Sequence, residues 1–396
     1  MATSDHGLNE NNERNLVRSY LTPMVSERQT AFLKILDTGT LNDLAESLYT
    51  SSRLYVEAAK SGKLGKVGSC AMYEKMIKDS AIGGPRHAAA LLHTIGKPVI
   101  RSIIKNTLAY DITHNTDSIN DFLLPADNCA GAYVATIRVK EGPDKGKCLS
   151  KQQWKQVIGQ VKDYLEIDPS PEQIDKAHSI EMRVCRRLHN DAMVRSLIEL
   201  GNREFFYKGI DIYWNMLWKR LGPEGRQHME ERQIQAPFYV GCSNQLGIRI
   251  QAYDTVEHLD GVAKLWKLLL SITNVLEYSI EPVLVPIIRI WQQDQLPIAE
   301  IMLTMLASSL TIDGGLNCVH PGTFKMKDDL TKFNAAIGML SGFDWIDKYI
   351  KESEDGVEAA VQARVNRIAV KMEIEEGRMQ DIEQKLEGQL AGLSFA

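Results

Sequence analysis

The last forty residues constrain the fold of this chain most strongly, because one row of residues there repeats at alternating steps of three and four. Eight of the ten residues in this row, which we call the seam, are apolar: Val361, Val365, Ile368, Met372, Glu375, Met379, Ile382, Leu386, Gln389 and Leu393. A repeat of 3.5 residues keeps one edge of a helix facing a partner helix, as in a coiled coil. A surface helix of a globular domain shows a wider apolar face. The pattern predicts a coiled-coil tail over 355–393, paired with another chain or with another part of this one.

The rest of the chain has the composition of a globular protein. Its 396 residues are 44% hydrophobic and 24% charged, enough for two or three domains or for one large two-lobed body. The six cysteines are scattered without a CxxC pair, which favours buried thiols over disulfides or a zinc site. We therefore expect no metal and no cofactor. The formal net charge is −5, so any nucleic-acid site has to be a local basic patch.

The sequence indicates a soluble, intracellular protein with no membrane contact. Its first residues are polar and lack the basic start and apolar core of a signal peptide. The most apolar stretch, 262–292, is interrupted by charged residues and by two prolines, which favours a buried pair of helices over a membrane span.

Helical spacing dominates the sequence, and the predicted fold is mainly α: a two-lobed helical body with one small β-hairpin and a C-terminal coiled-coil helix. In the hairpin, a strand over Ala132–Lys140 alternates apolar and polar residues, a turn covers 141–147, and Cys148-Leu149 begins the return strand. Among the predicted helices are 98–109 and 283–292. The predicted division is a disordered arm at 1–12, an N-terminal helical lobe at 13–130, the hairpin at 131–149, a central and C-terminal helical lobe at 150–352, and the tail at 355–393.

One group of basic residues stands out because no acidic residue occurs between Ser80 and Tyr110. Lys97, Arg101 and Lys105 are four apart and form one ridge of the helix predicted at 98–109, and Arg86 lies nearby in sequence. Cations stacked in this way repel each other unless an anion such as a phosphate backbone lies against them. The alternative is an ordinary solvated helical face.

Two further basic patches complete the candidate RNA-binding set. Arg183, Arg186, Arg187 and Arg195 follow one helix, where nearby acidic residues offer intrahelical ion pairs as the alternative. Arg138 and Lys140 lie at the predicted hairpin, where exposed turns are often basic for solubility alone. Tyr207 is a candidate base-stacking surface. If the patches converge, they form a groove for single-stranded RNA.

The sequence contains no catalytic motif that we recognise: no phosphate-binding loop, nucleophile elbow, HExxH or dinucleotide fingerprint. We therefore predict no catalytic residues and no enzyme activity. The alternative is an all-α enzyme whose site is built from His87, His93, His114 or Asp111.

In its helical body, polar N-terminal residues, basic residues in each half and helical C-terminal extension, the chain resembles the nucleocapsid or coat proteins of plant and fungal RNA viruses. It is similar to the nucleoprotein-like product of amalgaviruses, which is helical with a coiled-coil segment. It is also similar to the coat nucleoprotein of varicosaviruses and related viruses, which holds single-stranded RNA between two helical lobes. The resemblance implies a protein that polymerises along RNA and encapsidates it through sequence-independent phosphate contacts. Its expected location is the host cytoplasm and the virion or nucleocapsid.

Two other classes of protein stay open at this point. One is a non-viral scaffold or adaptor that dimerises through the coiled coil. The other is the shell protein of a double-stranded RNA virus, which needs little direct affinity for RNA.

Overall fold

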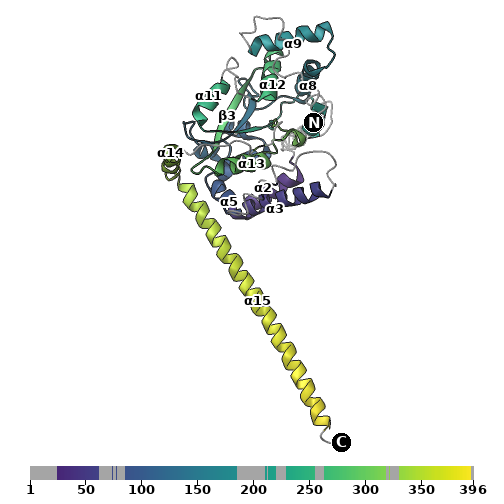
Figure 1. Cartoon of the computed structure of the whole chain (residues 1–396), viewed down its shortest axis with the longest axis vertical. Coiled ribbons are helices and arrows are strands. Elements are labelled where there is room, and N and C mark those ends of the chain that lie inside the picture. The colour runs from purple at the N-terminus through teal and green to yellow at the C-terminus, as the bar shows by residue number, and fades with distance from the viewer. Residues whose placement is uncertain are drawn as a thin grey trace, which may run out of the picture. The chain divides into compact units, whose positions relative to one another are not determined.

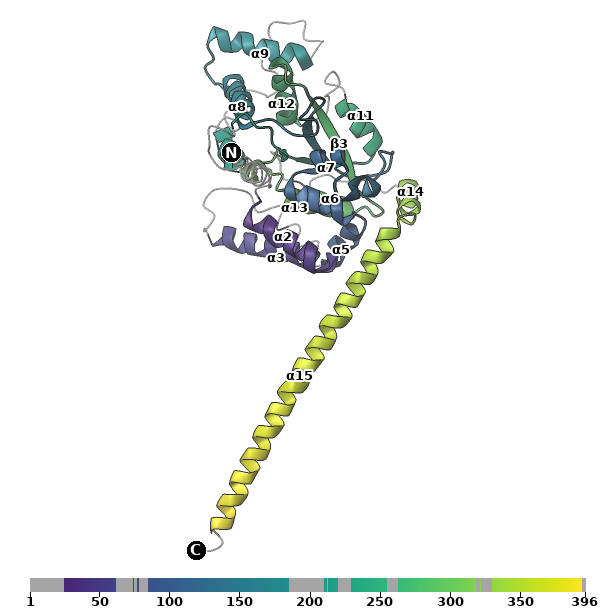
Figure 2. The same cartoon turned by 180° about the vertical axis from the view of Figure 1, so that it is seen from behind.

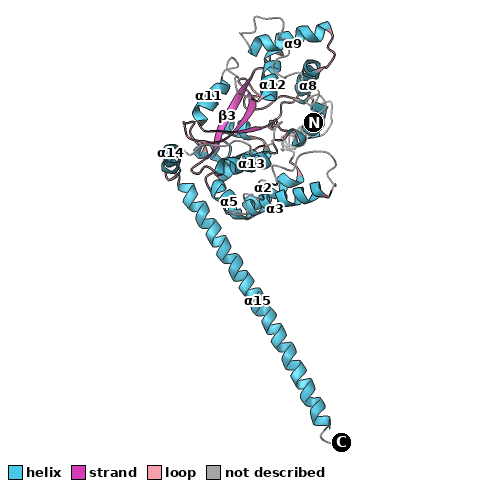
Figure 3. Cartoon of the chain, in the orientation of Figure 1, coloured by secondary structure: helices cyan, strands magenta, loops and turns pink. Residues whose placement is uncertain are grey.

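The computed structural model describes residues 25–61, 74, 77, 85–184, 210, 211, 213–219, 229–254, 263–317, 321 and 330–393. Residues 1–346 form one compact unit and residues 347–396 a second. The predicted arm at 1–12 lies outside the described residues. The structure confirms the mainly helical fold and the long C-terminal helix, and Figure 3 shows a single small sheet among the helices described.

The helices of the first half lie in three groups along the chain. The first group is α2 (Glu27–Thr38) and α3 (Leu41–Lys60). The second is α5 (Pro85–His93), α6 (Lys97–Lys105), α7 (Leu108–His114) and the 3-10 helix η1 (Thr116–Phe122). The third, after the first strand, is α8 (Lys151–Leu165) and α9 (Pro171–Val184). The single helix predicted at 98–109 is in fact α6 and α7, because Asn106 adopts a left-handed conformation with φ of 59° and ends the first of them.

The second half supplies two more strands and further helices among the described residues. They are β2 (Tyr239–Ser243), α11 (Leu246–Asp254), α12 (Lys264–Val275), β3 (Ile280–Arg289), α13 (Gln295–Ala307), the 3-10 turn η5 (Thr311–Asp313), α14 (Leu330–Leu340) and α15 (Asp344–Leu393).

The sheet is built around β1 (Gly131–Val139), which the sequence predicts correctly as a strand but with the wrong partners. The order is β2-β1-β3, and both neighbours run antiparallel to β1. The predicted return strand at Cys148-Leu149 is absent from the sheet, and the predicted helix 283–292 is largely β3. The predicted hairpin therefore does not divide the body, since its strand lies between segments of the later half of the chain.

The core sits on both sides of this short sheet. Tyr133, Ala135 and Ile137 of β1 belong to an apolar cluster with Trp154 of α8 and Trp266 of α12. Helix α13, almost wholly buried, packs against β1 and β2 and also against α5 and α6 (Figure 2). The central strand thus connects the N-terminal helices with the later ones in one body.

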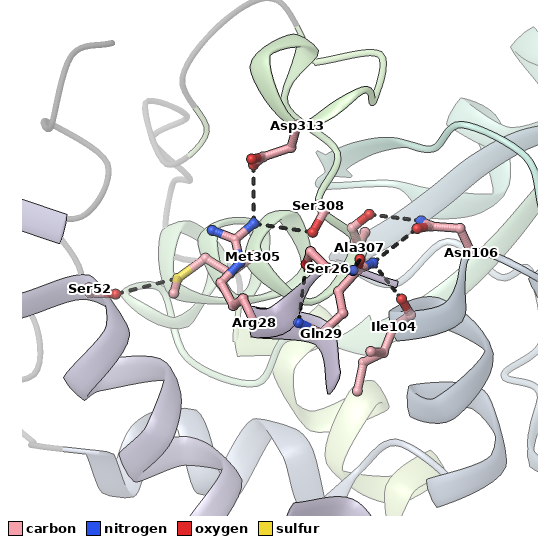
Figure 4. A network of polar contacts seen from close by, with 10 residues as sticks. All are labelled: Ser26, Arg28, Gln29, Ser52, Ile104, Asn106, Met305, Ala307, Ser308 and Asp313. Carbon is pink, nitrogen blue, oxygen red and sulfur yellow. Dashed lines mark hydrogen bonds and ion pairs between the residues drawn. The ribbon is translucent and has the colours of Figure 1, made fainter. Parts of the chain in front are cut away.

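A buried polar network joins three helix ends (Figure 4). The side chain of Gln29, 2% exposed, accepts a hydrogen bond from the backbone N–H of Ser26 at 2.9 Å and so caps α2. Its amide nitrogen donates to the Ile104 carbonyl at 2.6 Å and to Asn106 Oδ1 at 3.1 Å. Asn106 in turn donates to the Ala307 carbonyl at 2.8 Å. Five residues thereby fasten the start of α2 and the ends of α6 and α13 together.

A Gln29→Met substitution tests this network. Methionine keeps the volume and removes three hydrogen bonds, so buried groups of Ile104 and Asn106 lose a partner. We expect a loss of about 2–4 kcal/mol in the free energy of unfolding, measured by urea denaturation. The control is Gln251→Met, at an exposed position of helix α11. Equal stabilities of the two variants would contradict the role of the network.

Candidate RNA-binding ridge and self-association seam

The predicted basic ridge exists on α6. Gly96 precedes the helix at a point where a Cβ atom would lie 2.4 Å from Phe122, so only glycine permits this approach to η1. Pro98 favours the helical first turn. The inward face is buried and apolar, with Val99, Ile100, Ile103 and Ile104. The opposite ridge carries the three partly exposed cations Lys97, Arg101 and Lys105, which we call the basic ridge.

The central cation of the ridge has a counterion. Arg101 Nη1 lies 2.5 Å from Asp37 Oδ1 of α2, with side-chain exposures of 31% and 48%. Ion pairs at this degree of exposure contribute only about 0–1 kcal/mol, because water solvates both charges well. A phosphate can therefore replace the carboxylate at little cost. The ridge itself is held in place, since the Lys105 carbonyl accepts a hydrogen bond from Gln235 Nε2 at 2.8 Å.

Arg138 and Lys140 lie at the end of β1, and the first is engaged on two sides. Arg138 Nε donates to Glu281 of β3 at 2.8 Å, and its Nη1 donates to the hydroxyl of Thr113 on α7 at 2.9 Å. This arginine therefore links a strand pair to a helix, and a phosphate would have to compete with two partners. Lys140 is exposed.

Only some of the remaining candidate residues lie within the described part of the chain. Arg86 is exposed in the first turn of α5. Arg183 belongs to α9, but its side chain is outside the described part, as are the whole residues Arg186, Arg187, Arg195 and Tyr207. Of the described candidates, Arg101 pairs with Asp37 of α2, whereas Arg138 pairs with Glu281 of β3 and Thr113 of α7, so these two arginines are held by different elements.

The residues of the alternative enzyme site are engaged locally. Asp111 accepts hydrogen bonds from the hydroxyls of Ser102 and Thr107. His93 is buried with its Nδ1 2.5 Å from the Ala89 carbonyl, and His114 Nδ1 lies 2.9 Å from the Tyr110 carbonyl. His87 lies on α5, away in sequence from α7, which carries Asp111 and His114. Asp111, His93 and His114 are thus each bonded to groups of their own helix or of the neighbouring turn.

The described cysteines are not activated nucleophiles. Burial raises the pKa of the Cys148 thiol to about 12, and it also raises the pKa of Cys242. The pKa of Cys129 is raised by burial and then by the negative charge of Asp127. These thiols stay protonated at neutral pH, whereas nucleophilic cysteines need the thiolate.

Across the described ranges, no three histidine, cysteine or acidic side chains are grouped as metal ligands would be. Within those same ranges, no helix combines the length and the apolar content that crossing a bilayer needs.

The seam lies on one continuous helix. Helix α15 runs from Asp344 to Leu393, so the tail predicted at 355–393 belongs to one unbroken helix that begins before it (Figure 1). Six apolar side chains of the seam are 50–59% exposed: Val361, Val365, Ile368, Met372, Met379 and Ile382. Val370 and Ile374, outside the seam, are exposed to the same degree. An apolar row of this length in water marks an interaction surface.

Comparison with protein-family models, curated proteins and solved structures gives no match for this chain.

Paired asparagine substitutions test whether the seam drives self-association. In Ile368→Asn/Met372→Asn, two seam side chains become polar, and we expect the dissociation constant for self-association to rise about 100-fold or more, since each loses roughly 1.5–3 kcal/mol of burial. Light scattering over a concentration series measures this. The matched control is Val370→Asn/Ile374→Asn, which has the same spacing outside the seam. Equal weakening by both pairs would contradict the assignment of the seam.

Proposed function

We propose that the protein is the nucleocapsid or coat protein of an RNA virus, which self-associates and covers single-stranded RNA through contacts that are indifferent to sequence. The observation that carries this proposal is the exposed apolar seam of α15, because it supports assembly of many copies. The basic ridge supports the RNA contact, since its cations point away from the buried face of α6. The host cytoplasm and the virion are the locations that fit this function.

In the proposed mechanism, each protomer binds RNA weakly, and many linked protomers bind it together. The ridge spans about 12 Å along α6, so it can contact more than one phosphate of an extended strand. A few phosphate contacts per copy give low affinity and no base preference. Linking copies through their tails turns each further contact into an intramolecular event, which raises the affinity of the assembly for one strand. Coverage of the RNA is then cooperative.

A coiled-coil scaffold that binds a protein partner is the second candidate. It is favoured by the ion pairs of Arg101 with Asp37 and of Arg138 with Glu281, which leave less uncompensated positive charge for RNA. It shares the self-association step with the first candidate and differs in the ligand.

Charge reversal of the ridge tests RNA binding. In Lys97→Glu/Arg101→Glu/Lys105→Glu we expect loss of binding to a labelled single-stranded RNA. The slope of log K against the logarithm of the salt concentration should also become smaller in magnitude by about 2, because three phosphate contacts are lost. The control Lys60→Glu/Lys155→Glu/Lys176→Glu makes the same charge change on α3, α8 and α9. If the two variants bind alike, with circular dichroism showing both folded, the ridge is not the RNA site.

Removal of the counterion tests whether Arg101 itself is used. In Asp37→Asn the carboxylate that holds Arg101 becomes neutral, so the guanidinium is free for phosphate. We expect RNA affinity to increase by up to about 5-fold, matching the 0–1 kcal/mol of an exposed ion pair. Asp168→Asn, an exposed carboxylate near α9, is the control for overall charge. The same gain in both variants would show that only net charge matters.

A further inference from the structure

The charges beside the seam predict the direction of the partner helix. In heptad notation, seam residues Val365, Met372 and Met379 occupy position a, while Val361, Ile368 and Ile382 occupy position d. The residues just before a are at position g, and those just after d are at position e. Both columns flank the buried edge, so their charges face the neighbouring helix in an assembly.

The two columns have opposite charge. Four successive g positions are basic in the sequence: Arg364, Lys371, Arg378 and Lys385. The e positions Gln362 and Ala369 are neutral, and the next two, Glu376 and Glu383, are acidic. The described members of both columns lie on the helical part of α15, and the Arg378 side chain is 70% exposed. Its ion pair with Glu375 on the same helix, at 3.1 Å, is therefore weak.

The direction of the partner decides which charges meet. In a parallel coiled coil, a g residue faces the e residue five positions later on its neighbour, so Lys371 meets Glu376 of the second copy. The same spacing relates Arg378 to Glu383. In an antiparallel pair, g faces g and e faces e, so the basic column meets itself and the acidic residues meet each other. Attraction in one arrangement and repulsion in the other select the parallel one.

The shapes of the seam residues bear on the number of chains. Position d carries the β-branched residues Val361, Ile368 and Ile382, with Glu375 and Gln389 as the polar exceptions, and position a is mainly unbranched at Cβ, with Val365 as the exception. Leucine at a, as at Leu386 and Leu393, combined with isoleucine at d is typical of bundles with more than two helices. The reverse arrangement, with β-branched residues at a and leucine at d, favours two.

We propose that the tails of several copies of this chain form a parallel, in-register bundle of three or four helices, with its direction set by the basic g column and the acidic e column. The proposal rests on the self-association in the proposed function and specifies its geometry. Residues 347–393 extend over about 70 Å as a helix, so an antiparallel pair would separate the tail starts by about that distance. A parallel bundle brings the starts together. Each oligomer then presents several basic ridges from one end, which suits contact with a single strand.

Exchanging the charges tests the direction of the helices. Lys371→Glu/Arg378→Glu makes acidic the two g positions that face Glu376 and Glu383, and we expect the oligomer of the full-length chain to dissociate at concentrations at which the unmodified chain is assembled. Adding Glu376→Lys and Glu383→Lys restores opposite columns and should restore assembly. In an antiparallel pair, like charges would face each other in all three forms, so the three forms would assemble equally well. Equal assembly of the unmodified chain and both variants would therefore overturn the proposal.

Cysteine cross-linking provides the closing experiment. Val365→Cys places a thiol at position a, where in-register parallel copies bring the same residue together, while Val370→Cys places it on the outer side of the helix. A short thiol cross-linker applied to nuclease-treated protein should join copies through Cys in the first variant, at least about tenfold more than in the second or in the unmodified chain. Light scattering should give three or four times the mass of one chain.

The outcomes separate the two proposals. Oligomers without preferential cross-linking of Val365→Cys overturn the parallel arrangement and leave self-association in place. A mass of two chains overturns the size of the bundle. A monomer at all concentrations overturns both this inference and the self-association in the proposed function.

Discussion

An α-helix that carries Val361, Val365, Ile368 and Met372 along one edge cannot cover them with its own atoms, because side chains three and four apart lie side by side on its surface. Burial of such a row needs a second helix with the same period. Each methylene removed from water contributes about 0.8 kcal/mol, so the seam supplies a large free energy of association when several apolar layers are stacked. The tail therefore needs a partner helix to bury its seam, whichever ligand the body of the protein binds.

The body depends on a different interaction, the buried network of Gln29 and Asn106. This network fixes the C-terminal end of α6 against α2 and α13, and it thereby fixes the orientation of the basic ridge on the other side of the same helix. A rigid ridge loses little conformational entropy when it meets a phosphate backbone, which is an advantage for a site with few contacts. The Asp37 carboxylate competes only weakly with a phosphate for Arg101, because their ion pair is partly exposed.

Periodic features were predictable from the sequence, and those set by distant partners were not. The tail, strand β1 and the ridge of α6 follow local patterns with periods of 3.5, 2 and 3.6, and the structure contains them. Strand β3 was predicted as a helix because its apolar run contains Pro282 and Pro286 and has no clear alternation. The structure tolerates these prolines because β3 is an edge strand of the sheet. The counterions Asp37 and Glu281 could not be found from sequence, since each comes from an element remote along the chain.

The central claim is that the assembled chain holds RNA, and the most direct measurement is the nucleic-acid content of the full-length protein purified without nuclease treatment. The account predicts an absorbance ratio at 260 and 280 nm well above that of protein alone, together with RNA fragments that survive later nuclease digestion in the oligomer fraction. An oligomer with the absorbance ratio of pure protein and no protected RNA would contradict it, and the coiled-coil scaffold would then be the function that the structure supports.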